Sequence, residues 1–202
     1  MLDTEQIRLL FFRDVSLRMA QRRLKKLTEG KQIKRDRLSI NLPNFYYVGK
    51  RPCQIEHRLG VNWIYAWLRL NLRSWEKFHS FEWEVAYSVL RADGLCAIRN
   101  LALNNFTFSF VEFDIHESGN PFDKVGKYNA LYESREWQRS WWSSLATGFP
   151  SIIVVTTGNP RRIHDRVESE NRNGLEFIVK IYNQVKEECA HGSSGSTSIR
   201  AL

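Results

Sequence analysis

Hydrophobic residues near the start of the chain recur with the spacing of a helix. Apolar side chains stand three and four positions apart at Leu17, Ala20, Leu24 and Leu27. The basic residues Arg18, Arg22 and Lys25 fall on the opposite side of the same segment. This pattern predicts an amphipathic helix that packs through one face and exposes a basic face.

A shorter helix is expected before it. Asp3 and Gln6 have the spacing of a capping box, and Asp14 or Ser16 can cap the helix that follows. Gly30 stands just after the second helix, where a left-handed residue often ends a helix.

Two strands are expected next, beginning at residues 31–33 and 45–48, around a polar turn at 41–44. Two helices followed by a two-stranded wing is the order of a winged helix-turn-helix, whose second helix enters the major groove of DNA. A further helix normally precedes this pair, but the chain opens at the cap of the first helix. Either the start is truncated, or another segment or subunit covers that face.

In the rest of the chain, segments with the spacing of a helix alternate with segments that have the spacing of a strand, in which every second residue is apolar. Residues 55–72 have helical spacing, and residues 81–87 alternate between apolar and polar side chains, which predicts a half-buried strand. Strands are also expected at 95–98 and 106–115, with turns at Asp93-Gly94 and Asn104-Asn105.

After these strands, residues 124–137 return to helical spacing, and residues 151–157 form an apolar run typical of a buried parallel strand. Pro160 opens another helix, and residues 177–182 form a last strand or helix. The predicted fold class is α+β, a mixed α/β protein, with a DNA-binding domain at 1–52, an α/β domain with a central mixed sheet at 53–188, and a flexible tail at 189–202.

The distribution of charge supports a nucleic-acid partner. The formal net charge is +8, and residues 1–58 hold 14 Lys or Arg against 6 Asp or Glu, whereas the remaining residues hold 16 of each. Such a basic segment is typical of phosphate-backbone binding to double-stranded DNA, and the alternative is a solvated surface without a partner. The candidates for base contacts are Ser16, Arg18, Met19, Arg22 and Arg23. The candidates for backbone contacts are Lys25, Lys26, Lys34, Arg35 and Arg37.

Other patterns exclude several classes of protein. Cys53, Cys96 and Cys189 are far apart and odd in number, which argues against a disulfide framework or a zinc cluster. No apolar run approaches the ~20 residues of a membrane span, so we expect a soluble, cytoplasmic protein that does not bind membranes. The aromatic segment 137–142 fits a core or a protein interface better than a platform for single-stranded bases.

Acidic residues form the second candidate site. Glu112 and Asp114 are two apart in a predicted strand and therefore project on the same side of a sheet, while Asp93 stands at the mouth of another strand. Neighbouring carboxylates repel unless a cation such as Mg²⁺, Lys124 or Lys127 lies between them. The alternative is that the lysines pair with these acids only to stabilise the fold.

Taken together, several segments resemble the replication-relaxation family. These are residues 2–7, the Arg-rich residues 20–27, Glu56-His57, and residues 110–114 followed by Lys124 and Tyr128. The resemblance covers roughly residues 2–160. Members occur on plasmids, phages and integrative elements and pair a winged helix with an α/β domain. The resemblance implies a DNA-binding protein that acts in replication or its control, as a homodimer or with another protein partner.

The α/β part is also similar to the restriction-endonuclease-like core, in which an Asp and a Glu-x-Lys on adjacent strands bind a metal. By this resemblance Asp93 and Glu112 are the candidate ligands for Mg²⁺, with Asp114 and Lys124 as further catalytic candidates. Ala92 replaces the usual Pro before the Asp, and Asp114 replaces the usual Lys. A metal-dependent DNA nickase or nuclease is therefore the alternative function.

Overall fold

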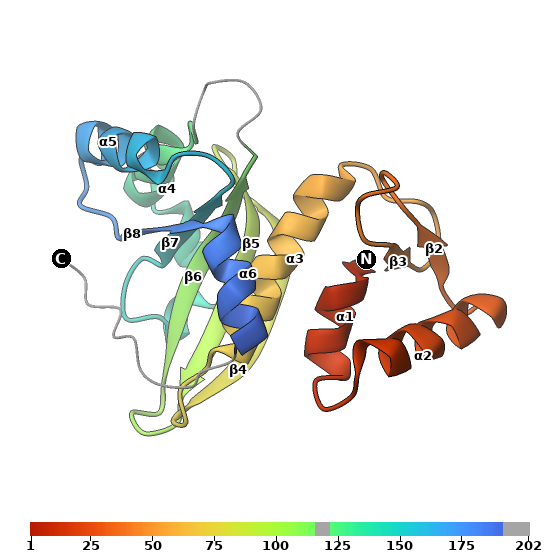
Figure 1. Cartoon of the computed structure of the whole chain (residues 1–202). Helices are drawn as coiled ribbons and strands as arrows, with labels where there is room; N and C mark the ends of the chain where they lie inside the picture. The colour runs from red at the N-terminus through yellow and green to blue at the C-terminus, as the bar shows by residue number, and fades with distance from the viewer. Residues whose placement is uncertain (116–121, 192–202) are drawn as a thin grey trace. The chain divides into compact units, whose positions relative to one another are not determined.

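The computed structural model describes residues 1–115 and 122–191 (Figure 1). The predicted mixed α+β class is confirmed, because the described residues contain six α-helices, a three-stranded sheet and a five-stranded sheet. The chain forms two compact units, Met1–Ala66 and Trp67–Leu202, called here the N-terminal and C-terminal units. Most of the expected tail at 189–202 lies outside the described residues, which end at His191 in the last helix.

The N-terminal unit combines two helices with a small antiparallel sheet. Its elements are β1 (Leu2–Asp3), α1 (Thr4–Phe11), α2 (Leu17–Glu29), β2 (Lys34–Asp36) and β3 (Phe45–Tyr47). The strand order is β1-β3-β2, and Arg35 of β2 pairs with Tyr46 of β3. The two helices and the strand pair follow the expected order, although β2 begins three residues later than the sequence predicted.

Both predicted helix starts are confirmed. Asp3 caps α1 in a capping box, since its Oδ1 accepts a 2.7 Å hydrogen bond from the Gln6 amide while Gln6 Oε1 accepts a 2.9 Å bond from the Asp3 amide. Ser16 caps α2 through a hydrogen bond from the Met19 amide. The Ser16 cap sets the start of α2 and with it the direction of the basic face of that helix.

Two details of α2 differ from the expectation. Leu17 is 44% exposed, so the buried stripe of the helix consists of Ala20 and Leu24. Gly30 keeps a φ of −75°, and Lys31 takes the left-handed conformation with a φ of 55°. The left-handed residue therefore lies one position later than predicted.

Helix α3 (Ile55–Leu70) lies against the first helix of the N-terminal unit. The Gln6 amide group donates to the carbonyl of Leu59 (2.8 Å), and the Trp63 indole donates to Oδ2 of Asp3 (3.0 Å). Asn62 donates in turn to the carbonyl of Met1. The face of α1 on which an additional helix was expected is thus contacted by α3, which follows β3 in the chain.

The C-terminal unit is built on a mixed sheet in the order β4-β5-β6-β7-β8. The strands are β4 (Glu76–Ala86), β5 (Arg91–Asn100), β6 (Asn105–Asp114), β7 (Ser151–Thr156) and β8 (Phe177–Ile181). The first three pair antiparallel, and β7 and β8 add in parallel. Parallel pairing requires a crossover, which α4 (Val125–Ser134) and α5 (Pro160–Glu170) supply.

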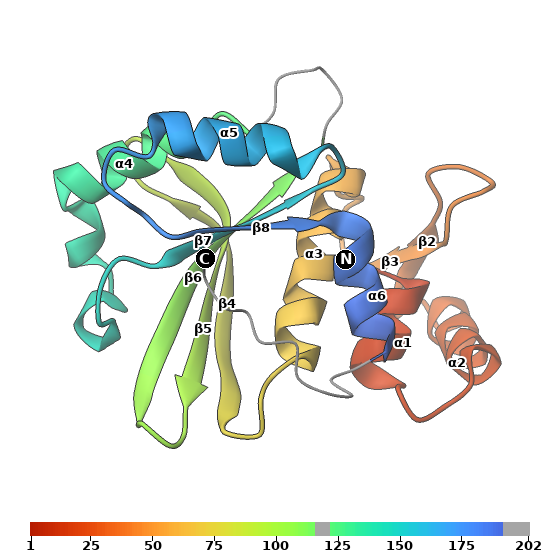
Figure 2. The ribbon, with the colours of Figure 1, turned by 60° about the vertical axis from the view of Figure 1, so that its left-hand side comes forward.

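Helices cover both faces of this sheet (Figure 2). On one face, Tyr128 of α4 and Ile163 of α5 join Phe110 and Ile152 in the main apolar core. On the other face, Tyr182 at the start of α6 (Tyr182–His191) contacts Phe113. Every residue of β7 is buried, as the continuous apolar run predicted.

The predicted turn at Asp93-Gly94 is wrong, because both residues lie inside β5. The turn that joins β4 to β5 comes earlier, where the Tyr87 amide donates to the Leu90 carbonyl. Gly94 serves close packing: a Cβ at this position would lie 2.6 Å from Cζ of Phe81. Gly94 is therefore explained by the Phe81 ring, which packs against the strand at this position, and not by a reversal of the chain.

Helix α4 ends three residues earlier than the periodicity predicted. Arg135 has a φ of 55°, and the 3₁₀ segments Glu136–Arg139 and Ser143–Leu145 follow. Trp142 stacks on Trp137 and is 1% exposed, which places it in the core as expected. No helix among the described residues is long and apolar enough to span a membrane.

Candidate nucleic-acid interface and a buried carboxylate cluster

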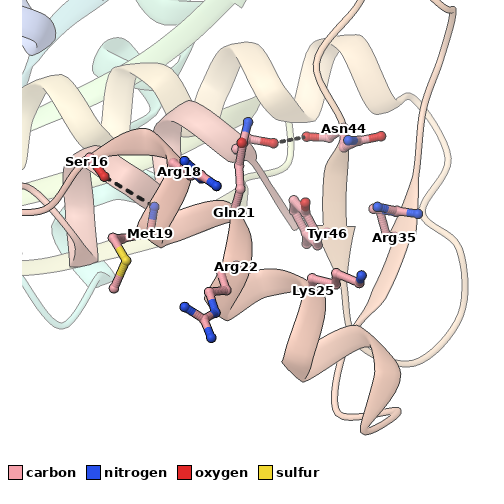
Figure 3. Close-up of a pocket in the computed structure, with 10 residues that line it drawn as sticks. Ser16, Arg18, Met19, Gln21, Arg22, Lys25, Arg35, Asn44 and Tyr46 are labelled. Atoms are coloured by element: carbon pink, nitrogen blue, oxygen red, sulfur yellow. Dashed lines mark hydrogen bonds between the residues drawn. The ribbon is translucent and has the colours of Figure 1, made fainter.

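Residues of α2 and of the β2–β3 pair line a groove of about 680 Å³, and Figure 3 shows their side chains. The groove is lined by Thr4, Ser16, Arg18, Met19, Gln21, Arg22, Lys25, Arg35, Asn44 and Tyr46. Four of these side chains are basic, and the described lining contains no acidic residue. The groove is therefore a positively charged surface feature of the N-terminal unit.

The packing of α2 determines which side chains face this groove. Leu24 packs with Ile7 and Tyr46 in a small apolar cluster, and Ala20 is fully buried. Because residues three and four apart share a helix face, burial of this stripe turns Arg18 and Arg22 outward. The amphipathic spacing of α2, together with packing against Ile7 and Tyr46, thus gives the helix one buried face and one exposed basic face.

Three guanidinium groups at the groove have no ionic partner among the described residues. Arg18, Arg22 and Arg35 make no ion pair or side-chain hydrogen bond with any described residue. Lys25 lies 3.7 Å from Glu29 in an exposed pair, which contributes little. The arrangement can therefore bind an anion without first breaking internal salt bridges.

The structure brings six of the ten predicted DNA-contacting residues to this groove. They are Ser16, Arg18, Met19, Arg22, Lys25 and Arg35. Arg23 and Lys26 are exposed on α2 but do not line it. Lys34 donates to the carbonyl of Gly49, and Arg37 donates to Asn44 Oδ1 and to the carbonyl of Ile40. Two of the predicted cations therefore make contacts within their own hairpin.

Sequence reasoning missed four lining residues: Thr4, Gln21, Asn44 and Tyr46. Gln21 could have been found, since it stands three residues after Arg18 and four before Lys25 on one helix. Tyr46 could not, because its place depends on its pairing with Arg35 across the two strands.

The second site is a buried cluster at the start of β5, the end of β6 and the start of α4. Glu112 is 1% exposed, and its two oxygens accept hydrogen bonds from Lys124 Nζ (2.5 Å) and the Tyr128 hydroxyl (2.6 Å). Lys124 Nζ also lies 3.6 Å from Asp93 Oδ1 and donates to the Arg91 carbonyl. One ammonium group therefore joins carboxylates from two adjacent strands.

Burial and charge shift the titration of these groups. Burial, aided by repulsion from Asp93, raises the pKa of Glu112 to about 8, although Lys124 and Tyr128 act in the opposite direction. Burial disfavours the charged form of Lys124, but attraction to Glu112 and Asp93 prevails and raises its pKa. At neutral pH the cluster therefore holds more protons than the same groups would hold in water.

Asp114 has different partners. Its oxygens accept hydrogen bonds from Thr156 Oγ1 (2.8 Å) and from the Phe122 amide (3.2 Å). Its carbonyl accepts one from the Thr157 amide. These contacts hold the chain where the parallel strands β6 and β7 end, so Asp114 stabilises the C-terminal ends of these two strands.

The predicted metal ligands form a pair rather than a larger set. Among the described residues, no group of three or more His, Cys, Asp and Glu side chains is placed to hold a metal ion. Lys124, and not the exposed Lys127, is the cation that reaches Asp93 and Glu112. Of the two candidate lysines, Lys124, at the N-terminal end of α4, is thus the one that contacts the carboxylates.

Comparisons with models of known protein families, with curated proteins and with solved structures found no match to this chain.

Proposed function

We propose that the protein binds duplex DNA through α2 and the β2–β3 hairpin, as a winged helix-turn-helix. One observation carries the proposal: Arg18, Arg22 and Arg35 meet at one groove and have no anionic partner among the described residues. Guanidinium groups on a helix face that is free of contacts suit phosphate oxygens and the acceptor edge of guanine.

A phosphate backbone fits this surface better than a small anion does. The basic residues spread over a helix of 13 residues and a neighbouring strand, so they can meet successive phosphates. The resemblance of the sequence to the replication-relaxation family adds the proposal that binding serves replication, or its control, on a mobile element.

Binding should be measured by fluorescence anisotropy with a labelled mixed-sequence duplex and the full chain. Arg22→Ala is expected to weaken binding by roughly tenfold, as for loss of one good Arg contact. Arg162→Ala, a change of the same type on α5, is the control and should bind like the wild type. Glu112→Gln should also leave binding intact. Equal losses from Arg22→Ala and Glu112→Gln would contradict the proposed role of α2.

A second candidate function, metal-dependent cleavage of DNA, is favoured by the position of Lys124. The sequence lacks the lysine expected at position 114, and Lys124 supplies an ammonium group beside Glu112 and Asp93. Asp93 and Glu112 supply the two carboxylates of a typical Mg²⁺ site. Water and phosphate oxygens commonly supply the other ligands of this ion.

If a divalent ion binds, Asp93 and Glu112 would hold it, and it would supply charge neutralisation and activated water. The residues of the chain would hold a proton at Lys124 Nζ and orient the Glu112 carboxyl group through the hydrogen bond from the Tyr128 hydroxyl. Glu112 must release its proton before it can bind a cation.

Supercoiled plasmid incubated with Mg²⁺ or Mn²⁺ tests this second candidate. Wild-type protein should be compared with Asp93→Ala and Glu112→Gln, with nicked and linear products separated on a gel. Nicking by the wild type that both variants lose supports cleavage. A plasmid that all three proteins shift but leave supercoiled excludes it and leaves DNA binding as the function.

A further inference from the structure

The connection between β2 and β3 displays apolar side chains to solvent. Ile40 is 84% exposed, the highest value among the large hydrophobic residues of the described chain, and Leu38 and Leu42 are also exposed. The connection projects from the strands as a hairpin loop (Figure 2). The groove described above uses none of these three residues.

Hydrogen bonds within the loop hold it in this form. Arg37 donates through Nε to Asn44 Oδ1 (3.1 Å) and through Nη1 to the carbonyl of Ile40 (3.2 Å). The Leu42 amide donates to the Ser39 carbonyl. Because the carbonyl of Ile40 accepts a hydrogen bond from Arg37, the backbone at Ile40 is held in a hydrogen-bonded turn.

The surroundings of the loop favour a polyanion over an apolar partner. From residue 38 to residue 49 the chain carries no charged side chain, and basic residues flank this stretch at 34, 35, 37, 50 and 51. Asp36, the nearest acid, pairs with Arg51, so the flanking cations without an ionic partner among the described residues are Lys34, Arg35, Arg37 and Lys50. A neutral apolar tip between basic flanks matches a groove that has phosphates along both walls.

The geometry of B-DNA then determines which groove the loop meets. A single phosphate backbone separates the major groove from the minor groove, and only the major groove is wide enough for a helix. If a backbone passes along the cations between α2 and β2, and α2 lies in the major groove, the hairpin faces the minor groove.

We propose that Ile40 is an apolar wedge that enters the minor groove, partly unstacks one base step and bends the bound duplex. Aliphatic side chains act in this way in architectural DNA-binding proteins, usually beside polar groups that contact base edges. Ser39 and Asn41, on either side of Ile40, supply such groups. This inference rests on the proposed function, and it adds a deformation of DNA that the cations alone do not produce.

Ring closure of a mixed-sequence DNA fragment of about 150 base pairs tests the wedge, because free DNA of this length resists closure. The wild type should accelerate ligase-dependent closure, and Ile40→Ser should abolish the acceleration. Ile40→Ser should also weaken binding by about tenfold, the effect of losing one buried aliphatic side chain. Val48→Ser is the matched control, since Val48 is 77% exposed on the same unit but lies outside the loop.

The outcomes separate the wedge from DNA binding itself. If the wild type and Ile40→Ser accelerate closure equally while Arg22→Ala weakens binding, the wedge is overturned and the proposed function stands. If the wild type does not bind the fragment, both are overturned. If Ile40→Ser instead changes the oligomeric state in sedimentation experiments and leaves closure unchanged, the loop is a protein interface and the wedge is overturned.

Discussion

Tyr128 donates a 2.6 Å hydrogen bond to Oε1 of Glu112 at a point that solvent does not reach, since the two residues are 0% and 1% exposed. The bond joins α4 to the central strand β6. An ionisable group in this position must be matched by its neighbours or remain protonated. The stability of the C-terminal unit should therefore depend on pH through this one carboxyl group.

The free energy of unfolding is expected to fall as the pH rises from about 5 to about 8. The pKa of Glu112 is raised to about 8 from the value of 4.5 typical of the unfolded chain, so the folded state binds the proton more tightly in this range. The stabilisation is fully present below pH 4.5 and is lost as the pH passes the folded value. The change is at most roughly 5 kcal/mol. Urea unfolding followed by tryptophan fluorescence at several pH values measures it.

Glu112→Gln is the variant that isolates this effect, because glutamine keeps the shape but does not titrate. Its stability should be nearly flat between pH 5 and 8, apart from the contributions of Asp93, Lys124 and Tyr128 that face the same position. Glu168→Gln, on the exposed side of α5, should retain the pH dependence of the wild type. An unchanged slope in Glu112→Gln would show that the carboxyl is ionised in the folded state.

Lys124→Met should destabilise the protein more at high pH than at low pH. Its ammonium group lies 2.5 Å from Glu112 and 3.6 Å from Asp93, and removal leaves two nearby carboxylates without this cation. Breaking a buried ion pair costs about 3–5 kcal/mol, and protonation of Glu112 reduces that cost in acid. Unfolding at pH 5.5 and pH 8.5 checks the difference, with Lys127→Met as the exposed control. A loss independent of pH would contradict it.

The sequence contained the signals for much of this cluster, but not for its geometry. Tyr128 stands four residues after Lys124, so a helix must place both on one face. The choice between Lys124 and Lys127 could not be made, because it depends on where α4 begins relative to β6. Asp114 was grouped with Glu112 from the alternation of side chains, and only the parallel pairing of β7 shows that Thr156 is its partner.

Local periodicity likewise located most of the helices and strands, but it misplaced some of their ends and failed where contacts with residues distant in the sequence set the conformation. Asp93-Gly94 has the composition of a turn, but its conformation follows from packing against Phe81 on the neighbouring strand. The contact of α3 with α1 had no local signal, since it depends on single hydrogen bonds such as that between Trp63 and Asp3. The spacing of residues within one segment does not predict long-range contacts of this kind.

Gly94→Ala should destabilise the C-terminal unit by about 1–3 kcal/mol, the usual range for overpacking. A new Cβ would lie 2.6 Å from a ring atom of Phe81, which is 8% exposed and has little room to move. Gly94 is not among the glycines with positive φ, so the constraint is space and not backbone conformation.

Combining Gly94→Ala with Phe81→Leu tests that explanation. The smaller side chain relieves the clash, so the loss in the double variant should be smaller than the sum of the two single losses. Additive losses, measured by urea unfolding at one pH, would show that the glycine is required for another reason.

DNA binding should depend strongly on salt, because Arg18, Arg22 and Arg35 of the proposed interface have no ionic partner among the described residues. The logarithm of the DNA-binding constant should fall steeply and linearly with the logarithm of salt concentration, by about 0.9 for each phosphate neutralised. If Arg22 contacts a phosphate, Arg22→Ala should lower the slope by about one. If Arg22 contacts a base instead, binding weakens mainly for one sequence and the slope changes little.

Arg35→Ala provides the comparison across the groove. Arg35 extends from β2, on the opposite side from α2, and is expected to contact the backbone whatever the sequence. The Arg35→Ala change should therefore reduce the salt slope and weaken binding to all duplexes by a similar factor. Arg161→Ala, at the start of α5, should change neither quantity. A wild-type slope near zero would contradict duplex binding at this groove, because no counterions would then be released from the phosphates.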